Sequence, residues 1–178
     1  KLYVVDTGAG VIRIINSQAG SHLGDLDMTG VSGGALSLVD VAFVDGKLIG
    51  TNLTTSSRGT PLKVYIWDND KSAPRVLLET TDIGSMNRIG DCIEVKANLT
   101  NGELVFLGQQ TRTYNTSSTT TATGNCNTII RYAITNGTVS TTAQKGDIDG
   151  FIIGLSPRAV PYGNDYFVVG QNYHPSVC

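Results

Sequence analysis

The stretch that most constrains the fold is Val39–Asn52, VDVAFVDGKLIGTN, in which apolar and β-branched residues flank Asp45-Gly46 on both sides. Both central residues of a two-residue hairpin turn take φ > 0, and Asp-Gly accepts this conformation, so the pattern predicts a β-hairpin. A similar unit recurs twice, with expected turns at Asn101-Gly102 and Gly163-Asn164. The turn glycines Gly46, Gly102 and Gly163 are 56 and 61 residues apart, so the chain has the spacing of a repeated hairpin unit.

β-Branched and aromatic runs bounded by Gly, Asn and Asp predict strands along the whole sequence, and no stretch combines a helical period with caps. The strands group into sets of three, four, four and two, within 2–28, 38–79, 92–143 and 158–171. We expect strands at Leu2–Asp6, Val11–Asn16, His22–Met28, Leu38–Val44, Lys47–Asn52, Leu62–Trp67, Arg75–Glu79, Cys92–Leu99, Glu103–Gln109, Thr128–Thr135, Thr138–Ala143, Arg158–Pro161 and Tyr166–Val169.

Recurring units of four antiparallel strands are typical of β-propeller blades, whose faces both pack on neighbouring blades. The main alternative within the all-β class is a β-sandwich. Propellers close with about 4–8 blades, whereas this sequence supplies about three and part of another. We therefore expect residues 1–178 to be a single domain that forms an arc of a larger propeller. The missing blades would come from the same chain or from another one.

Composition excludes several functional classes. The 178 residues suffice for a sizeable core, but 16% charged residues and a net charge of −2 indicate no partner such as nucleic acid or an anionic membrane surface. No apolar run approaches the roughly 18 residues of a transmembrane segment. No signal peptide precedes Lys1, and a strand pattern follows that residue at once. We therefore expect the sequence to begin inside a fold.

Cysteines and acidic residues indicate no cofactor. The odd set Cys92, Cys126 and Cys178 favours thiols over a complete disulfide framework, with a Cys92–Cys126 bridge as the alternative. No C-x-x-C pair supports zinc. Asp147 and Asp149, followed by Gly150, resemble half of a calcium loop, but apolar residues come next. They are weak calcium candidates, and a polar turn is the favoured interpretation.

The candidate ligand-binding residues are aromatic or imidazole side chains near polar segments. The Ser/Thr-rich stretch Thr111–Asn127 predicts a long exposed loop, and Tyr114 within it has a ring that could stack on a sugar. Tyr173 and His174 near the end of the sequence are further candidates. Gly-x-Ser-x-Gly is absent and neither His22 nor His174 has a triad-like setting, so we assign no catalytic residue.

Several segments carry a family resemblance: VAFVDGKLIGTNLT, KVYIWDND, RIGDCIEVKANLTNGELVF and IIRYAITNG. They resemble a family of domains of unknown function from surface or secreted lipoproteins of Bacteroides-type gut bacteria, some labelled putative cell-adhesion proteins. The resemblance covers roughly Leu2–Gln171. It implies a propeller-like fold, an extracytoplasmic address and an unassigned function, and it brings no functional residues with it.

These observations favour a non-catalytic binding or adhesion module outside the cell, at a bacterial outer-membrane surface or in the periplasm. Its ligand would be a surface glycan or another surface protein. One alternative is a propeller-type enzyme acting on glycans, with Asp40 and Asp91 as carboxylates around a channel. The recurrence of these two residues is more typical of a structural hydrogen-bonding device. A structural scaffold domain is the third hypothesis.

Overall fold

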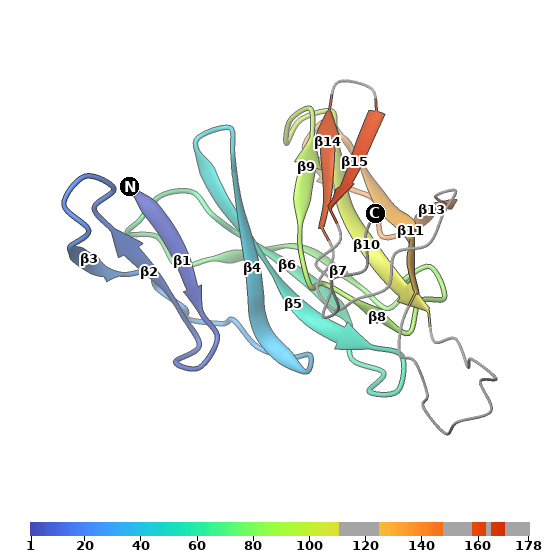
Figure 1. Cartoon of the computed structure of the whole chain (residues 1–178), viewed down its shortest axis with the longest axis horizontal. Coiled ribbons are helices and arrows are strands. Elements are labelled where there is room, and N and C mark those ends of the chain that lie inside the picture. Colours follow the sequence, from blue (N-terminus) through green and yellow to red (C-terminus); the bar gives the residue numbers. More distant parts are fainter. Residues whose placement is uncertain (111–124, 148–157, 163–164, 170–178) are drawn as a thin grey trace.

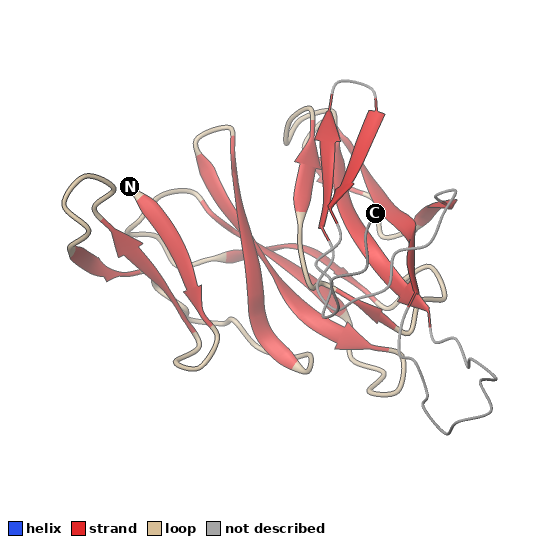
Figure 2. Ribbon diagram, viewed as in Figure 1, coloured by secondary structure: helices blue, strands red, loops and turns tan. Residues whose placement is uncertain are grey.

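The computed structural model of the chain describes residues 1–110, 125–147, 158–162 and 165–169. Within these residues every regular element is a strand (Figure 2), which confirms the all-β class. None of them forms a helix of the length and apolarity that crossing a membrane requires. The strands are β1 (Leu2–Asp6), β2 (Val11–Ile15), β3 (His22–Asp25), β4 (Leu36–Val44), β5 (Lys47–Thr55), β6 (Leu62–Trp67), β7 (Arg75–Thr80), β8 (Arg88–Ile89), β9 (Glu94–Lys96), β10 (Glu103–Gln110), β11 (Asn125–Thr135), β12 (Thr138–Val139), β13 (Gln144–Asp147), β14 (Arg158–Tyr162) and β15 (Asp165–Val169).

The strands pair with their neighbours along the chain as four antiparallel sets. The first set is β1-β2-β3, the second β4-β5-β6-β7, the third β9-β10-β11-β13 and the fourth β14-β15. Figure 1 shows the first set at one end of the long axis, the second in the middle and the other two at the far end. The chain thus advances along the molecule one set at a time.

Strand β8 joins the second set to the third. Arg88 lies opposite Thr55 of β5 and opposite Gln109 of β10, while Ile89 lies opposite Thr54. The second and third sets are thereby linked into one ten-stranded sheet. The sequence did not predict β8, because two residues carry no alternation that could distinguish a strand from a link.

The second set buries both of its faces. Alternate residues of β5 and β6 point to opposite sides, since successive side chains of a strand do so. On one side Leu48, Tyr65 and Trp67 pack against Ile12 and Ile14 of the first set. On the other side the second and third sets share a larger core, made up of Ile49, Leu62, Val64, Ile66 and Leu78 with Leu104, Phe106, Ile130, Tyr132 and Ile134. Three sets are therefore stacked face to face.

We call the contact between two stacked sets a joint. A similar hydrogen bond stabilises the joint between the first and second sets and the joint between the second and third sets. The indole Nε1 of Trp67 in β6 donates to the Asp27 carbonyl in the link between the first and second sets, at 2.8 Å. The Tyr132 hydroxyl in β11 donates to the Asp82 carbonyl in the next link, at 2.7 Å. Both aromatic side chains are buried, so each polar group needs such a partner. The recurring links thus have a structural role.

The turn predicted at Asp45-Gly46 is confirmed, and the turn at Asn136-Gly137 has the same conformation. The turn predicted at Gly163-Asn164 lies outside the described residues. Asp45 and Gly46 have φ of 50° and 74°, and Asn136 and Gly137 have φ of 50° and 76°. A turn with two left-handed central residues matches the twist of the flanking strands, and Asx-Gly accepts that conformation at low cost. The local sequence is sufficient at both places.

The prediction of a tight turn at Asn101-Gly102 is wrong. β9 ends at Lys96 and β10 begins at Glu103, so a longer loop connects them. The Asn98 Oδ1 organises this loop by accepting from the N–H groups of Thr100 and Asn101 at 2.9 and 2.8 Å. Such Asx turns offer the backbone an alternative to the hairpin turn.

The fourth strand of the third set is also misplaced in the prediction. The expected strand Thr138–Ala143 is replaced by the two-residue β12 and then by β13, Gln144–Asp147, which pairs with β11. The Thr-rich stretch has a high β propensity, but its residues form hydrogen bonds with Thr80 and Asp82, at the end of β7 and in the link that follows it. The Thr80 hydroxyl donates to the Thr141 carbonyl at 2.7 Å, and the Ala143 N–H donates to Asp82 at 2.9 Å. Tertiary contacts override the local preference.

Candidate functional site

A polar hollow lies where the β5–β6 loop meets the link that leads from β7 to β8. Its volume is about 370 Å³. Ile83 and Met86 are buried in the core and contribute the apolar part of its wall. The polar part consists of Thr55, Ser56, Thr60, Thr81, Asp82, Ser85 and Asn87. Hydroxyl and amide groups thus dominate the polar lining, with one carboxylate among them.

Hydrogen bonds between backbone groups hold the two sides of the polar hollow together. The Ser56 N–H donates to the Asn87 carbonyl at 2.9 Å, and the Asn87 N–H donates to the Gln109 carbonyl at 2.8 Å. Gly84 and Ser85 have φ of 64° and 62°, which bend the link sharply at the wall. A left-handed serine is sterically costly, and such residues cluster at functional sites. The hollow is therefore preorganised by its backbone.

Asp82 supplies the one carboxylate of the lining. Its Oδ1 accepts from the Gly84 N–H at 3.1 Å and its Oδ2 from the Ala143 N–H at 2.9 Å. Both oxygens therefore accept hydrogen bonds from backbone N–H groups, one in the link itself and one in the segment before β13. The polar hollow is suited to neutral hydrogen-bonding ligands rather than to a strongly charged one.

The two aspartates considered for catalysis are engaged in structural contacts. The Asp91 carboxylate, 1% exposed, accepts from Arg88 Nε at 2.7 Å and from Arg88 Nη2 at 2.5 Å. It also lies 3.4 Å from the Gln109 Nε2. The Asp40 Oδ2 accepts from the Ile93 N–H at 3.0 Å and so connects the second set to the third. This geometry agrees with the hydrogen-bonding interpretation.

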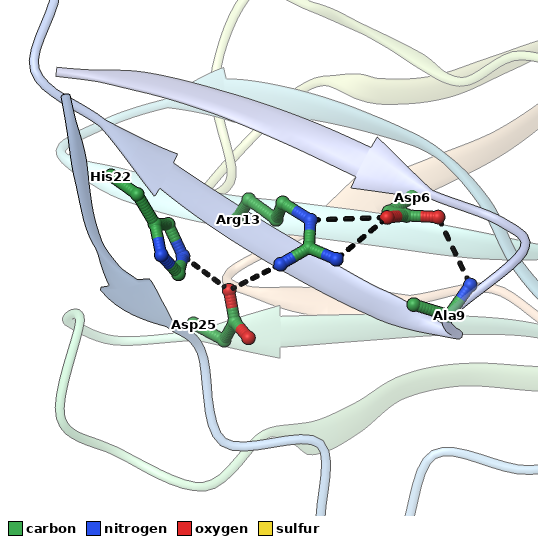
Figure 3. A network of polar contacts seen from close by, with 5 residues as sticks. All are labelled: Asp6, Ala9, Arg13, His22 and Asp25. Carbon is green, nitrogen blue, oxygen red and sulfur yellow. Dashed lines mark hydrogen bonds and ion pairs between the residues drawn. The ribbon is translucent and has the colours of Figure 1, made fainter. Parts of the chain in front are cut away.

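A second polar cluster covers the outer face of the first set (Figure 3). Arg13 Nε and Nη2 donate to Asp6 at 3.0 and 2.8 Å, and Arg13 Nη1 lies 3.7 Å from Asp25. The His22 Nε2 lies 2.8 Å from the same Asp25. The Ala9 N–H, and after it the Arg13 guanidinium, lower the pKa of Asp6. These partly exposed side chains thus form a network of polar contacts across three strands.

The sequence-predicted site residues fall largely outside the described residues. The structure does not describe Tyr114, Asp149, Tyr173 or His174. Asp147 is the last residue of β13, and only its backbone is described. No group of three or more His, Cys, Asp or Glu side chains in the described ranges is arranged to hold a metal ion. Cys92 is buried, while the side chains of Cys126 and Cys178 lie outside the description.

The residues of the polar hollow were missed by sequence reasoning. Ser56, Thr60 and Asn87 look like ordinary loop residues, and they converge only because β8 bridges β5 and β10. One signal was present in the sequence: the exit TDIG after the fourth strand of the second set recurs in related form after other sets. That signal marked a joint between sets but not a hollow.

The fold and the hollow together define the class: an all-β protein of stacked antiparallel strand sets with a polar recess, lined mainly by hydroxyl and amide groups, where two sets meet. The chain belongs to the family described as "Domain of unknown function (DUF4623)", whose model matches residues 15–160. A search of curated proteins gave no match.

A crystal structure of a DUF4623 family protein from Bacteroides eggerthii is similar to this chain, with 18% identity and a TM-score of 0.54. The likeness covers 90% of this chain and 39% of that one, so the chain spans well under half of the crystallised protein. At this identity the comparison shows the fold. The family match confirms the resemblance to a family of unknown function with a Bacteroides member.

Proposed function

We propose that the protein is a non-catalytic binding module that recognises a glycan in the polar hollow. The observation that carries the proposal is a lining in which hydroxyl and amide groups predominate beside the single Asp82 carboxylate, which matches the donors and acceptors of a sugar. Ile83 and Met86 form the apolar part of the wall, against which C–H groups of a ring would lie. A volume of about 370 Å³ lies within the range of small-molecule sites.

Tyr114 is the proposed aromatic partner of this site. β10 ends at Gln110, next to Gln109, whose carbonyl accepts from the Asn87 N–H at 2.8 Å. β10 therefore ends beside the polar hollow, and Tyr114 follows Gln110 closely in the sequence. An aromatic side chain with a polar tip is well suited to a ligand that is apolar on one face and polar on its rim.

The proposed scaffold is a sector of a β-propeller. Support comes from the second set, which packs on both faces, because a two-layer sandwich leaves the outer face of each sheet to solvent. The equivalent ties of Trp67 and Tyr132 are what repeated blades would require. The proposed location is the outer-membrane surface or periplasm of a bacterium, where a lipoprotein or adhesion protein would meet glycans; its support is the resemblance to surface lipoproteins.

A glycan array followed by isothermal titration calorimetry tests the proposal. We expect a neutral oligosaccharide to bind, and we expect Asn87→Ala and the double variant Ser56→Ala/Thr81→Ala each to weaken binding about tenfold, since a lost hydrogen bond costs about 1–1.5 kcal/mol. Tyr114→Ala should weaken it by a similar factor. Thr7→Ala, in the β1–β2 turn far from the hollow, is the matched control and should bind normally.

Two results would overturn the proposal. One is that no glycan binds above background to a protein whose circular dichroism and melting curve show that it is folded. The other is binding that survives all the hollow variants unchanged, which would place the ligand elsewhere.

A further inference from the structure

We infer that the open edge of β1 is a strand-acceptor site, filled by an antiparallel strand of the same polypeptide that lies outside the 178 residues. Within the described residues β1 pairs with β2 alone. The corresponding strands of the next two sets are paired on both edges: β5 by β4 and β6, and β10 by β9 and β11. An unpaired strand edge presents backbone groups to which another strand can add.

The register identifies β1 as the equivalent of β5 in the second set. β1 begins Leu2-Tyr3 directly after Lys1, and β5 begins Lys47-Leu48-Ile49. Leu2 lies opposite Ile15, the last residue of β2, and Leu48 lies opposite Trp67, the last residue of β6. The strand that the first set lacks therefore corresponds to β4.

The faces of β1 and β5 agree with this equivalence. Tyr3 packs against the core that the first set shares with the second. Ile49 packs in the same sense against the core between the second and third sets. Their neighbours Leu2 and Leu48 consequently point the opposite way.

An apolar hollow of about 480 Å³ lies where the added strand would place its side chains. We call it the edge hollow; Lys1, Leu2, Tyr3, Val41, Phe43 and Leu48 line it. Phe43 is 62% exposed and its ring stacks on Tyr3 with centroids 6.1 Å apart. The Tyr3 hydroxyl donates to Asp70 at 2.6 Å, which fixes one wall. Exposed large apolar side chains gathered around a hollow indicate a surface that is covered by a partner.

The second set predicts the register of the incoming strand. Phe43, Ala42 and Val41 lie opposite Leu48, Ile49 and Gly50. By equivalence, the incoming residue opposite Tyr3 takes the place of Ala42 and points toward the second set, into the edge hollow. The incoming residues on either side point away from it.

The occupant is assigned to the same polypeptide by continuity with the existing hairpins. β4 and β9 are each supplied from the residues just before the strand that they pair with. The related protein from Bacteroides eggerthii has a chain of which this one covers 39%, so family members contain further residues that can supply a strand. This assignment does not depend on the proposed glycan site.

The test adds a strand to the 178-residue protein. A copy of Leu36–Gly46, LSLVDVAFVDG, is placed directly before Lys1, because the same residues precede Lys47 in the second set. Hydrogen exchange of β1 amides is measured with and without it, together with molar mass by light scattering. We expect at least tenfold slower exchange in β1, a higher melting temperature and a monomer.

Two control extensions keep the length and turn. In the first, the copies of Ala42 and Val44, which point into the edge hollow, become aspartate; protection should be lost. In the second, the copies of Val41 and Phe43, which point away from it, become threonine; protection should remain.

Three outcomes would overturn the inference. One is that the unaltered copy of Leu36–Gly46 leaves the hydrogen exchange of the β1 amides unchanged. Another is that all three extensions slow this exchange equally. The last is an unextended protein that is already a dimer with protected β1 amides, which would make a second copy the occupant.

Discussion

Ser85 adopts a left-handed backbone conformation at the wall of the polar hollow, with φ of 62°. For an L-residue this conformation costs about 1–2 kcal/mol, whereas glycine accepts it freely. Glycine also gives the unfolded chain more freedom, which offsets about 0.4–1 kcal/mol. We predict that Ser85→Gly stabilises the protein by roughly 0.5–1 kcal/mol in urea unfolding. Ser85→Ala keeps the Cβ atom and should give no gain; equal gains for both variants would contradict backbone strain as the cause.

Asp70 connects the first set to the β6–β7 turn through Lys1 and Tyr3. The hydrogen bond from Lys1, followed by that from Tyr3, lowers the pKa of Asp70. A carboxyl whose folded pKa is lowered contributes stability above its unfolded value of about 3.9, and that contribution is lost as the pH falls through the folded pKa. We predict that the melting temperature drops below about pH 4, and that Asp70→Asn makes this drop smaller. If the melting temperature of Asp70→Asn fell as steeply below about pH 4 as that of the wild-type protein, the assigned role of Asp70 would be contradicted.

The same contact acts in the opposite sense at alkaline pH. The hydrogen bond to Asp70 is the main reason that the pKa of Tyr3 is raised to about 12. A raised folded pKa gives stability that is complete below the unfolded value near 10 and is lost as the pH rises through about 12. In Tyr3→Phe the melting temperature should therefore change less with pH between about pH 10 and pH 12 than it does in the wild-type protein. A wild-type protein with constant stability over that window would contradict the contact.

At the scale of the strand, close approach of β10 to the β7–β8 link requires a glycine. A Cβ atom at Gly108 would lie 2.3 Å from the Met86 Cγ and 2.6 Å from its Sδ. Overpacking of this kind costs about 1–3 kcal/mol even though methionine can shift. We predict a loss of this size for Gly108→Ala in urea unfolding. Gly146→Ala, where the added atom meets nothing within 4 Å, is the matched control and should be nearly neutral.

Sequence patterns predicted the strands best where a local signal was sufficient. Leu62–Trp67 is confirmed residue for residue, because β-branched and aromatic residues fill it and clear turns bound it. β8 and the placement of β13 were not predictable, since both depend on partners far along the chain. The polar hollow was not predictable for the same reason: its serine, threonine and asparagine side chains belong to two loops that tertiary pairing brings together.

At the scale of the whole molecule, stacking of the strand sets produces both proposed sites. The polar hollow lies at the joint between the second and third sets, where loop ends meet. The edge hollow lies between the first and second sets, beside the open edge of β1. A ligand site at a joint depends on the packing of two sets, so its shape is protected by the large core between them.

Glycan binding in the polar hollow is tested most directly by an NMR titration of the ¹⁵N-labelled protein with a series of neutral oligosaccharides. We expect saturable shifts of the amides of Ser56, Ser85 and Asn87 in the polar hollow, and none in the β1–β2 turn. The absence of any saturable shift, or shifts confined to the edge hollow around Phe43, would contradict the proposal that the joint between the second and third sets is a glycan site.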